Sequence, residues 1–147
     1  MNISAPALYD KLTFNNQNQK KTPWREMLLR DIEFLLNDAA RSASLNLYSY
    51  DHCEKSVINY GLPSLSKIIP INIDPVILAE HIQRILVIFE PRLDPRSIKV
   101  MPLVSPDQPF VLAILFDIYG SCLIPGNECV VNLRIALDYS CGAVRVF

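Results

Sequence analysis

The sequence predicts one α+β domain, in which two main helices pack on an antiparallel sheet of three or four strands. Two apolar stripes with helical spacing lie in the first two thirds of the 147-residue chain, and strand-like segments follow them. Half of the residues are hydrophobic and a fifth are charged, which is typical of a globular chain with a single sizeable core. Short connections between the strands favour the antiparallel arrangement.

Residues 1–21 are predicted to form a flexible N-terminal arm, and residues 22–147 the domain. A short apolar pattern, Leu8 and Leu12, opens the arm. The run 15–21 then contains only Asn, Gln and Lys, so it offers no side chain to a core. We therefore expect the arm to be a linker.

The first main helix is predicted to begin at Thr22 and Pro23. A threonine can cap the first helical turn, and proline suits the first position because its missing N–H would have no partner there. The apolar stripe of this helix is Leu28, Ile32, Leu35 and Leu36. Small and polar residues gather at 40–44, where we expect the helix to end.

The second main helix has the clearest pattern and is predicted to run from Asp74 to the residues before Pro91. Asp74 and Pro75 repeat the cap-and-proline start, and Pro91 ends the helix because it cannot donate a backbone hydrogen bond. The apolar stripe is Leu78, Ile82, Ile85, Leu86 and Phe89. The opposite, polar side is Glu80, His81 and Arg84.

Residues 45–73, between the helices, show no long periodic pattern. Within them, Asn59-Tyr60-Gly61-Leu62-Pro63 indicates a tight turn, because glycine allows a positive φ and proline makes the preceding residue extended. We expect the first two residues of this structural loop to hold it under the core rather than to contact a partner.

Four strand-like segments complete the domain. They are residues 97–103, 110–123, 129–138 and 143–147. The run from Phe110 to Phe116 is apolar on both faces, whereas a strand with one wet face alternates. Two helices cover only one face of a sheet, so either the N-terminal arm or a partner protein is expected to cover the other.

Charge and composition exclude several classes of function. The formal net charge is −1, and the basic cluster of Lys20, Lys21 and Arg25 is too short for a nucleic-acid interface. No signal peptide and no apolar run of membrane-spanning length occurs. We therefore expect a cytoplasmic protein with no nucleic-acid partner and no direct membrane insertion.

The cysteines and histidines lack the spacing of a metal site. No two cysteines form a C-x-x-C pair, and neither His52 nor His81 completes a zinc motif. We expect no metal and no cofactor, and we expect the cysteines to be small, reduced core residues. They are Cys53, Cys122, Cys129 and Cys141.

Three stretches, in order along the chain, carry a family resemblance. They are Asp31-Ile32-Glu33-Phe34-Leu35-Leu36-Asn37, Ser56-Val57-Ile58-Asn59-Tyr60-Gly61-Leu62-Pro63-Ser64-Leu65 and Phe89-Glu90-Pro91-Arg92-Leu93. They resemble the helix end, the Asn-Tyr-Gly-Leu-Pro loop and the Glu-Pro-Arg signature of the TssE family, which is similar to the sheath initiators of contractile phage tails. The chain departs from the family pattern at 38–41, where the family usually continues with Thr-Arg. It departs again at Ser64, where the family usually has an acid.

The resemblance implies a structural subunit of a type VI secretion baseplate, which docks on the cytoplasmic side of the inner membrane. Subunits that this chain resembles are held in each baseplate wedge by TssF, TssG and TssK. They offer sheet edges on which the first ring of the TssB and TssC sheath assembles. The resemblance also implies that Glu90, Pro91 and Arg92 anchor the subunit to the wedge.

The chemistry of the Glu-Pro-Arg segment is compatible with an anchor. Glu90 lies at a predicted helix C-terminus, where the helix dipole disfavours a negative charge by about 0.3–1 kcal/mol. Pro91 restricts the backbone, and the planar fork of Arg92 can bind a carboxylate or backbone carbonyls. The alternative is a weak surface ion pair within the domain, with Asp94 or Arg96.

The last segment, 143–147, alternates and is predicted to be an edge strand. An edge strand presents unpaired N–H and C=O groups, to which another chain can add a strand. We expect Val144, Arg145 and Val146 to form the edge that contacts the sheath, with 97–103 as the other available edge. Val144→Pro is expected to abolish sheath seeding while the domain still folds.

Two other functions are considered. A lysozyme-like glycoside hydrolase needs two carboxylates about 5–9.5 Å apart across a cleft. Glu26, Glu33 and Glu80 are expected on the outer sides of helices, and no nucleophile motif or glycine-rich phosphate loop occurs, so we do not expect an enzyme. An unrelated cytosolic protein-interaction module would fit the composition but would not explain three ordered motifs.

Overall fold

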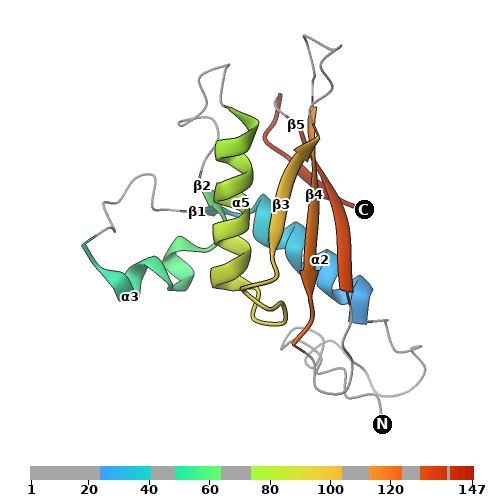
Figure 1. The fold of residues 1–147 in the computed structure, drawn as a ribbon. Helices are drawn as coiled ribbons and strands as arrows, with labels where there is room; N and C mark the ends of the chain where they lie inside the picture. The colour runs from blue at the N-terminus through green and yellow to red at the C-terminus, as the bar shows by residue number, and fades with distance from the viewer. Residues whose placement is uncertain (1–23, 41–48, 64–73, 104–112, 124–129, 139) are drawn as a thin grey trace, which may run out of the picture.

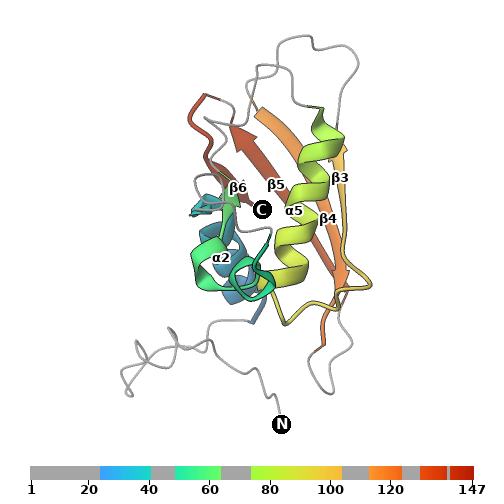
Figure 2. The ribbon, with the colours of Figure 1, turned by 90° about the vertical axis from the view of Figure 1, so that its left-hand side faces the viewer.

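The predicted α+β architecture is confirmed. The computed structural model describes residues 24–40, 49–63, 74–103, 113–123, 130–138 and 140–147. Its main sheet is antiparallel, with the strand order β3-β4-β5-β6. The strands are β3 (Lys99–Leu103), β4 (Ala113–Ser121), β5 (Val130–Asp138) and β6 (Val144–Val146). Helix α5 (Pro75–Phe89) lies against β3, and helix α2 (Trp24–Asn37) lies against β6 (Figures 1 and 2).

Helix α2 buries the predicted stripe. Its buried side chains are Met27, Leu28, Ile32, Leu35 and Leu36. The predicted cap at Thr22 and Pro23 lies outside the described residues. The predicted end at 40–44 is wrong, because the helix stops at Asn37 and the next residues form the two-residue strand β1 (Ala39–Ala40). There the backbone pairs in parallel with β2 (Leu62–Pro63), so it is not free to continue the helix.

Helix α5 follows its sequence signals closely. The Asp74 carboxylate accepts a hydrogen bond of 2.9 Å from the backbone N–H of Val76, and Pro75 takes the first helical position. The buried stripe of the helix is Leu78, Ala79, Ile82, Ile85 and Leu86. Glu80, His81 and Arg84 are exposed, as predicted.

The segment between the two main helices, for which the sequence shows no long periodic pattern, contains two short helical turns. Helix α3 (Asp51–Glu54) and the 3-10 turn η2 (Val57–Asn59) stand to one side of the body (Figure 1). Arg84 of α5 forms an ion pair with Glu54, which ties this segment to the domain.

Gly61 is required where the segment returns to the domain. Its φ is +104°, and a Cβ atom there would lie 2.3 Å from the backbone oxygen of Asp38. The same oxygen accepts a hydrogen bond of 3.0 Å from the N–H of Leu62. We call the β1–β2 pairing, with Gly61 beside it, the β1–β2 clasp.

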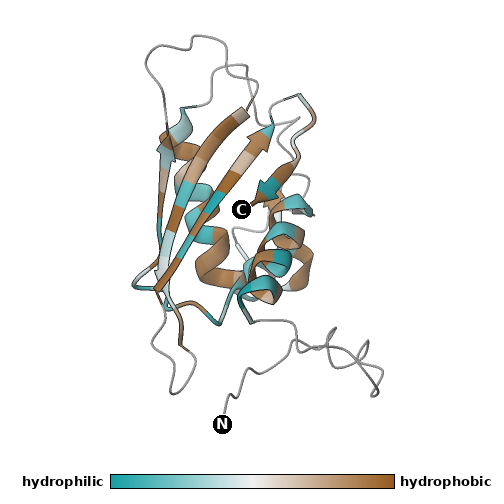
Figure 3. Cartoon of the chain, turned by 90° about the vertical axis from the view of Figure 1, so that its right-hand side faces the viewer, coloured by the Kyte–Doolittle hydropathy of each residue, from teal (hydrophilic) through white to brown (hydrophobic). Residues whose placement is uncertain are grey.

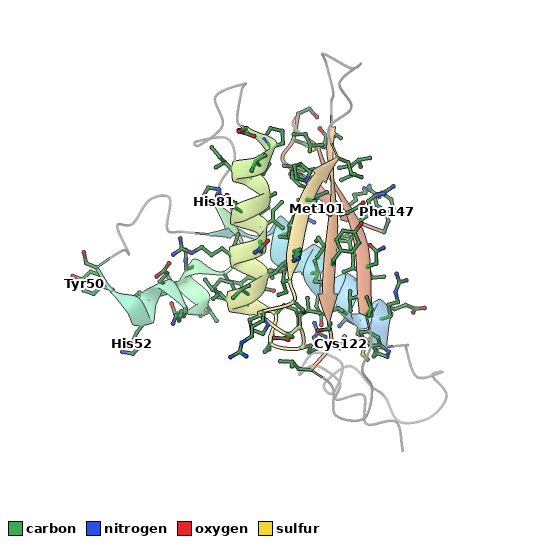
Figure 4. All side chains as sticks on the ribbon, viewed as in Figure 1. Tyr50, His52, His81, Met101, Cys122 and Phe147 are labelled. Atoms are coloured by element: carbon green, nitrogen blue, oxygen red, sulfur yellow. The ribbon has the colours of Figure 1, made fainter. Side chains whose placement is uncertain are left out.

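The two faces of the main sheet differ in burial. On the inner face, β4 and β5 bury Ile114, Phe116, Ile118, Val131, Leu133, Ile135 and Leu137 under the helices. The outer face, toward the viewer in Figure 3, carries both polar residues, such as Asp117 and Arg134, and apolar ones. Four large apolar side chains on it are exposed by 37–63%, namely Met101, Leu103, Leu115 and Phe147. Met101 and Phe147 lie on the sheet, far from Tyr50 and His52 on the α3 segment (Figure 4).

The second face of the sheet was expected to be covered by the N-terminal arm or by a partner protein, and this stays a prediction. Residues 110–112 of the apolar run and the whole N-terminal arm lie outside the described residues. In the described part of the run, Leu115 lies on the outer face and is 37% exposed, and Asp117 follows the run on the same face.

The cysteines occupy three different environments. Cys122 is buried, Cys53 is half-buried and Cys141 is exposed, and none of the three forms a disulfide. Cys129 lies outside the described residues. The expectation of core cysteines is therefore wrong for Cys141, which lies in the tight turn between β5 and β6, where Gly142 has a φ of +71°.

Candidate functional site

The Glu-Pro-Arg segment lies where α5 ends and the chain turns toward the sheet. The N–H of Glu90 completes the last helical turn by donating to the Leu86 carbonyl at 2.9 Å. Leu93, which is fully buried, bridges to Cys122 just after β4. The Arg92 carbonyl accepts a hydrogen bond of 2.9 Å from the N–H of Leu123. The segment is thus fixed at both ends, to α5 and to the end of β4.

The two charged side chains of the segment bind each other. The Nε and one terminal nitrogen of Arg92 each donate to Glu90 at 2.6 Å, one to each carboxylate oxygen. The backbone N–H of Arg92 adds a third hydrogen bond, of 3.1 Å, to the same carboxylate. Glu90 is only 4% exposed, so this fork compensates a charge that both burial and the helix dipole disfavour.

Arg92 also joins the two main helices. Its other terminal nitrogen donates to the carboxylate of Asp31 on α2 at 3.0 Å. The second oxygen of Asp31 accepts hydrogen bonds of 2.7 and 3.0 Å from the guanidinium of Arg30. Burial lowers the pKa of Arg92, but hydrogen bonds and opposite charges from Glu90 and Asp31 outweigh burial and raise it. We call Arg30, Asp31, Glu90 and Arg92 the junction network.

The ion pair within the domain is therefore not the one the sequence suggested. The sequence suggests Asp94 or Arg96 as the partner, but the Asp94 carboxylate instead accepts the backbone N–H of Arg96 at 3.0 Å. Asp31 was missed because it lies 61 residues from Arg92 in sequence. The one signal that could have found it is that Asp31 opens the first stretch carrying the family resemblance.

The structural loop packs beside the junction network. The rings of Tyr60 and Phe89 meet edge to face, with centroids 5.4 Å apart. Burial, and then the nearby negative charges of Asp31, Asp38 and Glu90, raise the pKa of Tyr60. The side-chain amide of Asn59 donates to the Glu54 carbonyl at 2.9 Å. Tyr60 thus packs against α5, Asn59 bonds within its own segment, and Pro63 takes part in the β1–β2 clasp through its backbone.

The open edge of β6 is occupied by side chains of α2. Asn37 both donates to the Val144 carbonyl, at 2.7 Å, and accepts from the Val144 N–H, at 2.8 Å. A carboxylate oxygen of Glu33 accepts from the Val146 N–H at 3.3 Å. Val144 is buried and Arg145 is exposed. The predicted sheath-contact residues thus form an edge strand whose outward N–H groups already have partners.

The outer sheet face carries a second acid–arginine pair. Asp117 on β4 and Arg134 on β5 are directly opposite each other, and the guanidinium donates to both carboxylate oxygens, at 2.8 and 3.1 Å. The hydrogen bond from Arg134 is the main reason that the pKa of Asp117 lies below its ordinary value. The pair separates Met101 from Phe147, which lie in the same cross-strand row.

The comparisons with known proteins identify the family. The model of the baseplate wedge protein gp25 family matches residues 24–122, about two thirds of the chain. The chain belongs to the gp25 family. This is the family of TssE, so the predicted resemblance is confirmed. No curated protein and no solved structure matches the chain.

The gp25 family match spans the elements that build the junction network. It begins at the first residue of α2 and ends just after β4, so it contains all four network residues and the β1–β2 clasp. As a member of the gp25 family, the protein is a structural component of a baseplate. Within the described ranges, no helix is long and apolar enough to cross a membrane.

Proposed function

We propose that this protein is a TssE subunit of a type VI secretion baseplate, where it is held in the wedge and initiates the contractile sheath. Its partners on this proposal are the wedge proteins TssF, TssG and TssK and the sheath proteins TssB and TssC. Its place is the cytoplasmic side of the inner membrane. The single observation that carries the proposal is the gp25 family match over residues 24–122.

The wedge anchor of this proposal is the segment Glu90, Pro91 and Arg92. Because Arg92 binds Glu90 and Asp31 inside the domain, we assign it the role of shaping the anchor rather than of reaching out to the partner. Pro91 is exposed between the two charged residues, and the side chain of Arg92 is 26% exposed. The wedge would thus bind a rigid, proline-centred turn and the exposed rim of the guanidinium.

The sheath contact of this proposal is the β6 edge, at Val144, Arg145 and Val146. The other edge, on β3, is less suited to strand addition. Its residue Pro102 has no N–H, and its Val100 N–H donates to the side chain of Gln83 at 3.2 Å. β6 keeps all its N–H groups, and only side chains cover those that face outward.

Among the described residues, the most buried acid is Glu90, and its bonding disfavours the enzyme alternative. Both carboxylate oxygens of Glu90 accept hydrogen bonds from Arg92, so neither is free to contact a substrate. Glu54 is paired with Arg84, and Glu26 and Glu80 are exposed. We therefore infer a binding role rather than glycoside hydrolysis. An unrelated interaction module is set aside because it does not account for the family match.

Co-purification with the wedge proteins tests the proposal. We would express the chain with tagged TssF and TssG and compare wild type with Pro91→Asp, which alters the exposed turn and keeps all four side chains of the junction network; circular dichroism would confirm that the variant is folded. Pro95→Asp is the matched control, because Pro95 is an exposed proline in the next turn. We expect wild type and Pro95→Asp to join the complex and Pro91→Asp to be lost from it.

Two results would contradict the proposal in different ways. If wild type fails to join TssF and TssG although it is folded, the baseplate assignment to a type VI system is wrong. If all three proteins join equally, the subunit belongs to the wedge but Glu90, Pro91 and Arg92 are not its anchor.

A further inference from the structure

The two sides of strand β6 are bonded in different ways. Toward β5, the carbonyl of Ala143 accepts the Asp138 N–H, and Phe147 exchanges two hydrogen bonds with Arg134. Toward the open side, strand geometry directs the backbone groups of the intervening residues, Val144 and Val146. These outward groups are the ones that an added strand would bind.

Asn37 makes the same two hydrogen bonds at Val144 that an added strand would make. A side-chain amide contains one C=O and one NH₂ group, so it can imitate a peptide group. Here the amide accepts from the Val144 N–H at 2.8 Å and donates to the Val144 carbonyl at 2.7 Å. An incoming strand would offer one N–H and one C=O at this position, so it must compete with Asn37 for both.

Glu33 covers the next outward N–H group of β6, that of Val146. Residues 33 and 37 are four apart on α2, so they lie on one side of the helix. The amide of Asn37 also donates to the Glu33 carbonyl at 2.8 Å, which holds the last turn together. Glu33 then accepts the Val146 N–H. We call Asn37 and Glu33 the edge cover.

The opposite edge of the sheet, on β3, is closed to strand addition in a different way. At β3, Gln83 accepts the outward N–H of Val100, and the next outward position is Pro102, which has no N–H to offer. A proline closes an edge permanently, whereas a side-chain amide can turn away from it. Of the two edges of the main sheet, β6 is thus the one whose closure rests on side chains alone.

We propose that the edge cover keeps β6 from pairing with other strands until an extended segment of the sheath displaces it. This inference rests on the proposed function for the identity of the partner, but not for the closure itself. Exposed edges pair with one another, so an uncovered subunit would self-associate before it reached the baseplate. The cover prevents this and leaves a partner that brings a full set of N–H and C=O groups able to replace it.

The experiment opens the cover without disturbing the core. Asn37→Ala removes both hydrogen bonds at Val144, and the double variant with Glu33→Ala removes the third. This is a cleaner change than Val144→Pro, because Val144 is only 2% exposed and its replacement would disturb the core. Asn132→Ala is the matched control, since Asn132 is an exposed asparagine on β5 outside the edge.

Two readouts require only the full chain. Amide hydrogen exchange at Val144 should become roughly tenfold faster in Asn37→Ala, as expected for the loss of one hydrogen bond of ordinary net strength. Light scattering should show self-association of the double variant at concentrations where wild type and Asn132→Ala are monomeric. Asn37→Asp, which can accept but not donate, should lie between wild type and Asn37→Ala in both measurements.

A third readout adds purified TssB and TssC and measures the lag before sheath assembly. We expect a shorter lag with Asn37→Ala than with wild type. If exchange at Val144 and self-association are unchanged in the variants, the edge cover is refuted. If both increase but no variant, nor wild type, seeds the sheath, the cover stands as a barrier to self-pairing and the proposed sheath role is refuted.

Discussion

Two acid–arginine pairs in this protein each contain a buried acid, but their arginines differ in exposure and in the elements that they join. In the junction network, Glu90 is 4% exposed and Arg92 bridges onward to Asp31 on another helix. On the outer sheet face, Asp117 and Arg134 also form two hydrogen bonds, but the arginine side chain is 52% exposed. The first pair joins elements far apart in sequence, whereas the second joins neighbouring strands that backbone hydrogen bonds already hold together.

Because the two arginines differ in exposure, we expect the two pairs to contribute differently to stability, although each arginine side chain donates two hydrogen bonds to its acid. Removing one partner from a buried pair leaves a charge with neither water nor a counter-charge. Removing the exposed partner on the sheet face lets water replace much of what is lost. The junction network should therefore matter for folding, and the outer pair mainly for the response of stability to pH.

Arg92→Ala should have the largest effect on stability and should show most clearly how the two pairs differ. It leaves Glu90 buried at a helix C-terminus without its fork, and it frees α2 from the end of α5. We expect a loss of about 3 kcal/mol in the free energy of unfolding, measured by urea denaturation. Arg96→Ala, an exposed arginine in the next turn, should change it by less than about 0.5 kcal/mol. Equal effects of the two variants would contradict a structural role for the network.

Arg134→Ala should have a smaller effect at neutral pH and a distinct one in acid. The folded-state pKa of Asp117 lies below the unfolded value of about 3.9, so the pair stabilises the fold above roughly pH 4. That contribution is lost as the pH falls through the folded pKa. The variant should lack this part of the acid dependence, so wild type and variant should converge in stability at low pH. Parallel curves from pH 7 to pH 2.5 would contradict the prediction.

Tyr60→Phe should have the smallest effect on stability of the three variants, and this effect should be seen only at alkaline pH. Burial and neighbouring carboxylates raise the pKa of Tyr60, so the folded state holds the phenol proton more tightly than the unfolded state does. This stabilisation is complete below the unfolded pKa of about 10 and is lost as the pH rises through the folded pKa. Between pH 8 and pH 11, the melting temperature should fall less steeply with pH in the variant than in wild type. Tyr50→Phe, at an exposed tyrosine, is the control and should leave the slope unchanged.

The elements of this fold were predictable where a local pattern determines them. The start and the buried stripe of α5 follow from Asp74, Pro75 and a strict apolar spacing, and the alternation along β5 identifies its inner face. The end of α2 was not predictable in the same way. Residues 39 and 40 could continue a helix by composition, and only their pairing with 62 and 63, brought near by the fold, ends it.

The candidate sites also combine residues that a local pattern predicts with partners that only the fold brings near. The Glu90, Pro91 and Arg92 segment was visible as a motif, but its partner Asp31 was not, because no periodicity relates residues 61 positions apart. The edge strand 144–146 was predicted from its alternation and its place after the last turn. Its cover by Asn37, 107 positions away, follows only from how α2 packs against the sheet.

The β1–β2 clasp has a consequence for how this protein can vary. Because Asp38 and Leu62 are held together, the chain leaves the domain and re-enters it at nearly the same place. Lengthening a loop whose ends are already joined costs little, about 0.6 kcal/mol for each doubling of its length. The excursion between the two halves of the clasp is thus a place where insertions can accumulate, or a reporter can be grafted, while Gly61 must stay a glycine.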